Sequence, residues 1–238
     1  LRDAPFTPIT TAEGLPADRA YTVAADPNGG VWVGTTGGLA RVVGGRAVQT
    51  VTRDNGLLGN DISTVTVTRD GTVWAGIEGE GLCRVVGGRV AGCLTEGRGL
   101  PDPFVISLHE DTSGTLWAGT STGLSRWTGA AFEPTAGIEA PVTALGSSAG
   151  TVWVGTYGAG LVRVRDGEAE TVVGTEDDNI LTIHAREGAV WAGTDGGGLL
   201  RVRTSSSSGR RPKGGILRLT TANGLPSDIV PQVMEDDE

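Results

Sequence analysis

The segment Val31-Trp32-Val33-Gly34-Thr35 decides the fold, because close copies of it recur along the chain. The tryptophans of successive copies are 42, 43, 36 and 38 residues apart. The four further copies are Val73-Trp74-Ala75-Gly76-Ile77, Leu116-Trp117-Ala118-Gly119-Thr120, Val152-Trp153-Val154-Gly155-Thr156 and Val190-Trp191-Ala192-Gly193-Thr194. A Gly-Leu pair follows each copy, as in Gly38-Leu39. Such a period is the signature of a repeat architecture.

Each repeat contains four short β-strands. In the first repeat a strand at residues 21–25 precedes the turn at residues 26–30, and the tryptophan segment is the second strand. The third strand begins at Leu39 and ends at the Gly44-Gly45 turn, and the fourth covers residues 47–52. Four antiparallel strands every 40 to 45 residues are typical of propeller blades. The sequence therefore predicts an all-β fold: a β-propeller with five complete four-stranded blades.

The tryptophan of each repeat is expected to fill the space between neighbouring blades. The glycine two residues later would let the neighbouring blade approach closely. We therefore expect all five rings to be core residues, namely Trp32, Trp74, Trp117, Trp153 and Trp191.

The two ends of the chain share one position of the repeat. Residues 11–18, TAEGLPAD, match residues 221–228, TANGLPSD. The chain thus adds partial strands at both ends to its five blades. We expect residues 1–238 to form a single β-propeller domain that is part of a six- or seven-bladed ring. The Ser-rich stretch from Thr204 to Gly215 is expected to form a long mobile loop between two strands.

These motifs closely resemble two-component regulator propeller repeats. The shared pattern is Gly-Leu-Pro, a strand that ends in Asp, then Gly-x-Val/Leu-Trp-x-Gly-Thr and Gly-Leu-x-Arg, and it covers essentially the whole chain. The resemblance implies an extracytoplasmic sensor region of a bacterial two-component system, with a periplasmic or secreted location and a ligand that is often a carbohydrate.

Composition narrows the classes of partner. The net charge is −9, and no basic stripe is present, which argues against nucleic-acid binding. No stretch approaches the roughly 18 apolar residues of a membrane helix, so no membrane insertion is predicted for this chain.

The two cysteines, Cys83 and Cys93, lie on the third and fourth strands of the second repeat. If Gly87 to Arg89 form a three-residue loop, Cys83 faces Cys93 at a distance that suits a disulfide. Such a bond fits an oxidising compartment. A register shifted by one residue would instead leave two free core thiols.

Catalytic and metal sites are not evident. A metal-dependent lyase of the streptogramin-lyase type, which the fold also resembles, would need converging histidines. His109 lies two residues before Asp111 and His184 three before Glu187, which predicts opposite strand faces. No catalytic residues, metal ligands or cofactor are therefore predicted, and the chain is not expected to be an enzyme.

Ligand-binding residues are expected on the loops where repeats join, because loops on rigid scaffolds carry function. The predicted function is a non-catalytic, ligand-binding sensory module; alternatives are a structural or protein-interaction subunit and, third, a metal-dependent lyase. The partner would be a small molecule, such as a carbohydrate, or a protein. The candidate ligand-binding residues are Arg19, Asp61, Glu78, Phe104, Tyr157 and Asp195.

Overall fold

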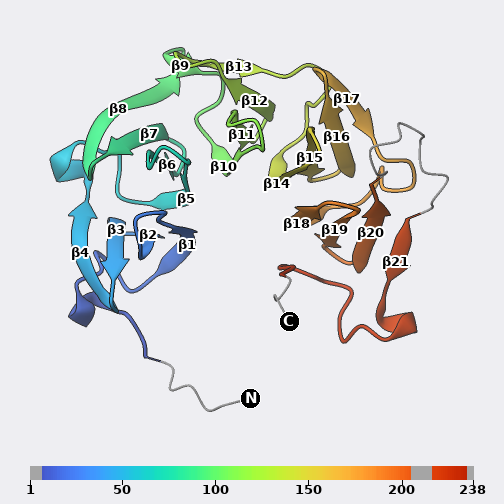
Figure 1. Ribbon diagram of the computed structural model, residues 1–238, viewed down its shortest axis with the longest axis horizontal. Coiled ribbons are helices and arrows are strands. Elements are labelled where there is room, and N and C mark those ends of the chain that lie inside the picture. The colour runs from blue at the N-terminus through green and yellow to red at the C-terminus, as the bar shows by residue number, and fades with distance from the viewer. Residues whose placement is uncertain (1–6, 205–215, 235–238) are drawn as a thin grey trace. The chain divides into compact units, whose positions relative to one another are not determined.

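The computed structural model describes residues 7–204 and 216–234. It contains five sheets, four with four antiparallel strands and one with a fifth, short strand, and these are the blades of a β-propeller (Figure 1). The predicted mobile loop from Thr204 to Gly215 lies outside the described residues, apart from Thr204 itself. The chain divides into two compact units, residues 1–105 and 106–238.

The first unit contains blades 1 and 2. Blade 1 consists of β1 (Ala20–Ala25), β2 (Val31–Thr35), β3 (Gly38–Val43) and β4 (Arg46–Val51). Blade 2 consists of β5 (Ile62–Val67), β6 (Val73–Ile77), β7 (Gly81–Val86), β8 (Arg89–Glu96) and the short β9 (Gly99–Leu100), which pairs in parallel with β8. The predicted strands are thus present to within one residue in the first repeat.

The second unit contains blades 3, 4 and 5. Blade 3 consists of β10 (Val105–Glu110), whose first residue belongs to the first unit, β11 (Leu116–Thr120), β12 (Gly123–Trp127) and β13 (Phe132–Pro134). Blade 4 consists of β14 (Val142–Ser148), β15 (Thr151–Thr156), β16 (Leu161–Arg165) and β17 (Glu168–Thr171). Blade 5 consists of β18 (Ile180–Arg186), β19 (Ala189–Thr194), β20 (Leu199–Arg203) and β21 (Leu217–Leu219).

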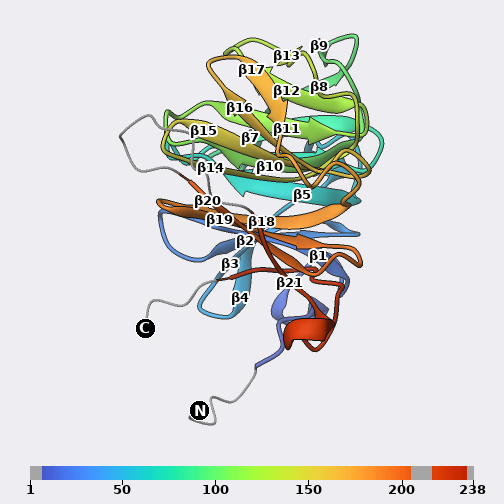
Figure 2. The same ribbon diagram turned by 90° about the vertical axis from the view of Figure 1, so that its right-hand side faces the viewer.

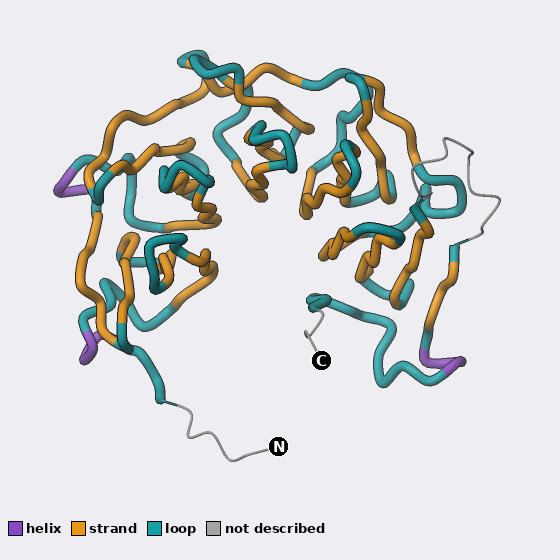
Figure 3. Tube along the Cα trace, in the orientation of Figure 1, coloured by secondary structure: helices purple, strands orange, loops and turns teal. Residues whose placement is uncertain are grey.

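Short 3-10 helices, each a single turn, lie before or after a blade (Figure 3). They are η1 (Thr11–Glu13), η2 (Arg53–Asn55) and η3 (Thr221–Asn223). In each of them the first backbone N–H donates to a side chain seven residues later. In η1 the Thr11 N–H donates to Asp18 Oδ1 at 2.6 Å, and in η3 the Thr221 N–H donates to Asp228 Oδ1 at 2.6 Å. The two ends of the chain therefore share one local structure, as their matching sequences predict.

The sheets pack face to face within a unit, and Trp117 and Trp153 each contact the blade that follows their own. In the second unit the sheet of blade 4 lies against that of blade 5 (Figure 2). Trp153 of β15 joins a core with Ile180 and Val190 of blade 5. Likewise, Trp117 of β11 joins a core with Val152 and Val164 of blade 4.

Four of the five predicted core tryptophans are buried: Trp32, Trp74, Trp117 and Trp153. Trp191 differs, because it is only partly buried. Its ring packs under the Arg201 guanidinium, 5.2 Å from the ring centroid. No complete blade follows β21 in the described residues, so the ring lacks the neighbour that buries Trp117 and Trp153.

The glycine two residues after each tryptophan allows this close packing. A Cβ on Gly34 would lie 2.7 Å from Cγ2 of Ile62, and one on Gly155 would lie 2.6 Å from Cγ2 of Ile180. Both isoleucines are fully buried and begin the first strand of the next blade. The glycine therefore makes room for the neighbouring blade, as predicted.

Candidate functional site

Two positions, each exposed or partly exposed, recur at one end of each blade. The first is the residue before the first strand, and the second is the residue after the second strand; we call them rim positions. A backbone hydrogen bond from the second residue to the first joins them in four blades. The donor and acceptor residues are Thr36 and Arg19, Glu78 and Asp61, Tyr157 and Pro141, and Asp195 and Asn179, at 2.9 to 3.1 Å.

All six predicted binding residues occupy rim positions. Arg19, Asp61 and Phe104 precede first strands, whereas Glu78, Tyr157 and Asp195 follow second strands. All six side chains are exposed. The structure joins Asp61 to Glu78 through the backbone hydrogen bond of 2.9 Å. Ligand binding by these residues stays a prediction.

In the first unit, local packing holds two rim side chains in place. The Arg19 guanidinium lies over the ring of Tyr21, 4.9 Å from its centroid. The Phe104 ring packs on Gly79, because a Cβ there would lie 3.0 Å from the ring. Phe104 nonetheless keeps 48% of its surface exposed. The ring is thus both supported and accessible.

In the second unit, the rim presents an aromatic ring and a carboxylate. Tyr157 is 52% exposed. Asp195 is exposed and pairs through its backbone with Ile229. The neighbouring Thr194 carbonyl accepts the Val230 N–H at 2.9 Å, so residues near the C-terminus extend the sheet edge beside Asp195.

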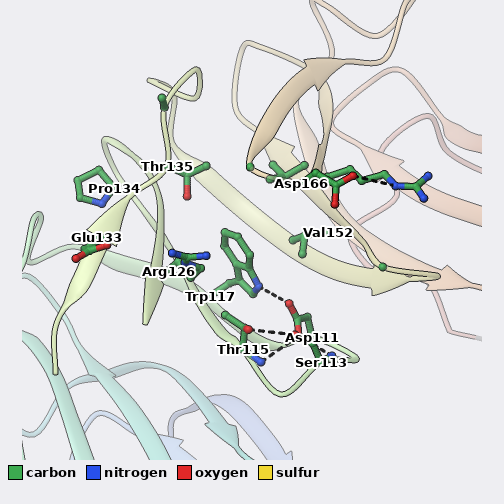
Figure 4. A pocket seen from close by; sticks show the side chains of 15 residues that line it. Asp111, Ser113, Thr115, Trp117, Arg126, Glu133, Pro134, Thr135, Val152 and Asp166 are labelled. Carbon is green, nitrogen blue, oxygen red and sulfur yellow. Dashed lines mark hydrogen bonds and ion pairs between the residues drawn. The ribbon is translucent and has the colours of Figure 1, made fainter. Parts of the chain in front are cut away.

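Sequence analysis did not identify a groove between blades 3 and 4, within the second unit. It has a volume of about 470 Å³. It lies where the β10–β11, β14–β15 and β16–β17 turns meet, at the opposite strand ends from the rim positions. Figure 4 shows polar side chains around it, including Asp111, Arg126, Glu133, Thr135 and Asp166.

Asp111 lies beside Trp117 in this groove and accepts hydrogen bonds from three residues around it (Figure 4). Oδ2 accepts the Trp117 Nε1–H at 2.8 Å, and Oδ1 accepts from Ser113 and Thr115. Burial alone would raise the pKa of Asp111, but the hydrogen bonds from Ser113, Trp117 and Thr115 outweigh it and hold that pKa below its usual value. Asp111 is therefore a charged structural acceptor.

No sequence motif pointed directly to this groove. Arg126 was visible as the repeat's arginine, and Trp117 and Asp111 as a core ring and a turn residue. These residues come together in one groove only through the packing of blades 3 and 4. Whether the arginine is free there depends on the hydrogen-bond acceptors around it. Neither follows from the spacing of the repeats.

The predicted opposite facing of His109 and His184 is wrong. Each is the fifth residue of its strand, β10 or β18, so both have the same position in the blade. The prediction assumed equal turns, whereas the β18–β19 turn contains only Glu187 and Gly188 and the β10–β11 turn is longer. His109 Nε2 bonds to Ser147 Oγ of β14 at 2.8 Å.

Metal-ligand chemistry finds no support in the described part of the chain. No group of three or more His, Cys, Asp or Glu side chains there could hold a metal ion.

No helix in the described residues is long and apolar enough to cross a membrane.

Several solved structures share the fold at low sequence identity. The extracellular domain of BT4673 from B. thetaiotaomicron matches with a TM-score of 0.74 and 20% identity, over 94% of this chain and 31% of that one. PorZ, a surface component of the type-IX secretion system of Porphyromonas gingivalis, matches with a TM-score of 0.72 and 14% identity, over 97% and 38%. Virginiamycin B lyase from Staphylococcus aureus matches with a TM-score of 0.65 and 15% identity, over 84% and 69%.

The chain thus spans about a third of the length of the first of these structures. Identities this low show the propeller fold alone. Among curated protein sequences, no significant match is found.

The sequence itself matches a family model at two places. The model describes the two component regulator propeller, and it matches residues 14–37 and 99–122. The first segment begins in the connection before blade 1, and the second begins at β9. Both end just after the second strand of a blade, so they include the tryptophan segments of blades 1 and 3. The chain therefore carries two component regulator propeller repeats.

Proposed function

We propose that this chain is a non-catalytic, ligand-binding sensory module in the extracytoplasmic part of a bacterial two-component-type signalling protein. The rim positions carry the proposal. Their backbone hydrogen bond repeats in four blades, yet their side chains include a cation, three carboxylates and two aromatic rings, and those six are exposed. A rigid scaffold that presents varied side chains at equivalent places is suited to recognition.

The disulfide supports an extracytoplasmic location. Cys83 and Cys93 are bonded, and such bonds persist in oxidising compartments and are rare in the cytosol. Solved structures with the same fold include extracellular domains of hybrid two-component systems. Both observations favour a periplasmic or secreted protein.

The rim chemistry favours a carbohydrate ligand. Tyr157 offers an accessible ring that can stack on a sugar face, and Phe104 offers a second in the other unit. Asp195 and Glu78 are exposed carboxylates that can accept hydrogen bonds from hydroxyl groups. We infer that these side chains bind neutral saccharides without turnover.

Thermal unfolding tests this proposal directly. Maltose, cellobiose, xylobiose and lactose are each titrated, and at least one should raise the melting temperature, because a ligand that binds only the folded state stabilises it. A Tyr157→Ala, Asp195→Ala double variant should keep its intrinsic melting temperature but lose this shift. The matched control is Val173→Ala with Glu187→Ala, which removes an exposed apolar and an exposed acidic side chain, neither of which occupies a rim position.

Two outcomes would contradict the proposal. If the control variant lost the shift as fully as the rim variant, the rim would not be the site. If no saccharide shifted the melting temperature, the interaction-subunit alternative would replace it. Product formation during the titration would favour the lyase alternative instead.

A further inference from the structure

The groove between blades 3 and 4 contains an arginine of the repeat, and two of its four equivalents, in blades 1 and 4, form ion pairs. In each blade this arginine lies on the third strand, opposite the tryptophan of the second strand. Arg41 in blade 1 donates to Asp26 of the β1–β2 turn at 2.6 Å. Arg163 in blade 4 donates to Glu170, its neighbour across β16 and β17, at 2.5 Å. Of the other two, Arg84 is exposed and Arg201 lies over the Trp191 ring.

Blade 3 contains an aspartate in the turn between its first two strands and a glutamate across from the arginine, but Arg126 bonds to neither. Asp111 of the β10–β11 turn is occupied by Trp117, Ser113 and Thr115. Glu133 lies opposite Arg126 across β12 and β13, yet the two side chains form no ion pair. Among the described residues, Arg126 has no hydrogen-bond or ion-pair partner. Figure 4 shows its guanidinium beside Trp117, within the groove.

We propose that Arg126 binds the carboxylate of a small hydroxylated acid in this groove. A guanidinium matches a carboxylate with two parallel hydrogen bonds, which makes such a pair strong and specific. The groove volume of about 470 Å³ lies within the range of small-molecule sites. This site is separate from the rim positions and does not depend on the function proposed for them.

The other charges in the groove restrict the ligand to a single negative charge. Its lining includes the carboxylates of Asp111, Glu133 and Asp166 and the guanidinium groups of Arg126 and Arg165. Acidic groups therefore outnumber basic ones, so the lining disfavours a doubly charged phosphate more strongly than a singly charged acid. A monocarboxylate meets about half that repulsion and can pair with the Arg126 guanidinium.

The remaining lining suits hydroxyl groups. Thr135 contributes a hydroxyl that both donates and accepts, and Glu133 can accept hydrogen bonds. Val152 and Val164 form an apolar wall against which the carbon skeleton can lie. Sugar acids have this combination of one carboxylate, several hydroxyls and a compact carbon frame.

NMR with D-galacturonate as the probe tests the proposal on the intact chain. The Trp117 indole N–H, assigned with a Trp117→Phe variant, reports on the groove because it bonds to Asp111. Galacturonate should shift this resonance in a saturable way, whereas D-galactose, which lacks the carboxylate, should bind at least about tenfold more weakly. Inorganic phosphate should behave like galactose.

The two matched variants are Arg126→Gln and Arg163→Gln, which change the same repeat position in neighbouring blades. Arg126→Gln should weaken galacturonate binding by at least about tenfold, and Arg163→Gln should leave it unchanged. In the unmodified protein, two results would overturn the proposal: galactose or phosphate binding as tightly as galacturonate, or no saturable shift with galacturonate. Neither result depends on whether the variants fold. The Tyr157→Ala, Asp195→Ala variant should bind galacturonate normally, so this test and that of the rim fail independently.

Discussion

Cys83 and Cys93 face each other across β7 and β8 because Ala91 is an extra residue in β8. Near the turn, Val85 pairs with Val90, whereas beyond Ala91 the pairs are Arg84 with Gly92 and Cys83 with Cys93. Ala91 therefore forms a β-bulge. Blade 1 shifts its register at the same place, between the Val42–Ala47 and Arg41–Gln49 pairs. Blades 1 and 2 thus share the bulge, whereas β16 and β17 of blade 4 pair without one, and blade 2 uses it to align a disulfide.

Removing the disulfide should destabilise the protein. Cys83 is fully buried, and the bond closes a loop with a sequence separation of 10. A Cys83→Ala, Cys93→Ala double variant should lose about 2–3 kcal/mol of unfolding free energy, mainly because its unfolded chain is less constrained. Urea denaturation measures the loss. Mass spectrometry of unreduced, alkylated peptides provides the control, and two alkylated thiols would contradict the bond itself.

The repeat made the fold predictable. Contacts made by residues that differ from one repeat to the next could not be predicted in this way. Five tryptophan segments and their glycine turns defined the strands, because each repeat had to satisfy the same packing. The cysteine pairing was predicted correctly, but from a three-residue loop. The structure instead has a two-residue turn, Gly87-Gly88, and a bulge at Ala91. The turn is one residue shorter than predicted and the bulge adds one residue, so beyond the bulge the predicted register is correct.

The candidate site was predictable only in its location. The rim residues were found because a fixed offset from each strand places them at one end of the blade. The groove was missed because Arg41, Arg126 and Arg163 are equivalent in sequence, and only their packing separates paired from unpaired arginines. The histidines were misplaced because turn length, not distance to an acidic residue, sets the register of a strand.

Substituting two equivalent tryptophans by phenylalanine should have unequal effects. Trp117 Nε1 donates to Asp111, whereas Trp153 Nε1 is buried and has no hydrogen-bond partner in the described structure. Trp117→Phe would leave a buried carboxylate with one donor fewer, so it should cost about 1–3 kcal/mol more than Trp153→Phe. Equilibrium urea unfolding of both variants measures the difference. Equal losses would show that the Trp117–Asp111 bond adds nothing to stability.

The low pKa of Asp111 should make stability depend on pH. Because its folded pKa lies below its unfolded value, the charged group stabilises the fold above the unfolded pKa of about 3.9. That contribution is lost as the pH falls through the folded pKa. The stability difference between the native protein and Asp111→Asn should therefore be largest near neutral pH and shrink in acid. Asp166→Asn, which changes an exposed carboxylate, is the control; a difference for Asp111→Asn that stayed constant from neutral pH into acid would contradict the assignment.

Gly155 should be intolerant of even one added methyl group, and the cause should be the next blade. An alanine Cβ there would lie 2.6 Å from Cγ2 of Ile180, closer than real contacts allow. Because Ile180 is fully buried, it has little room to move, so Gly155→Ala should cost about 1–3 kcal/mol. Ile180→Ala alone should also destabilise, since it leaves a cavity. The double variant removes the clash and partly fills that cavity, so its loss should be clearly smaller than the sum of the two single losses. Additive losses in a urea-unfolding double-mutant cycle would show that blades 4 and 5 are not in contact at this glycine.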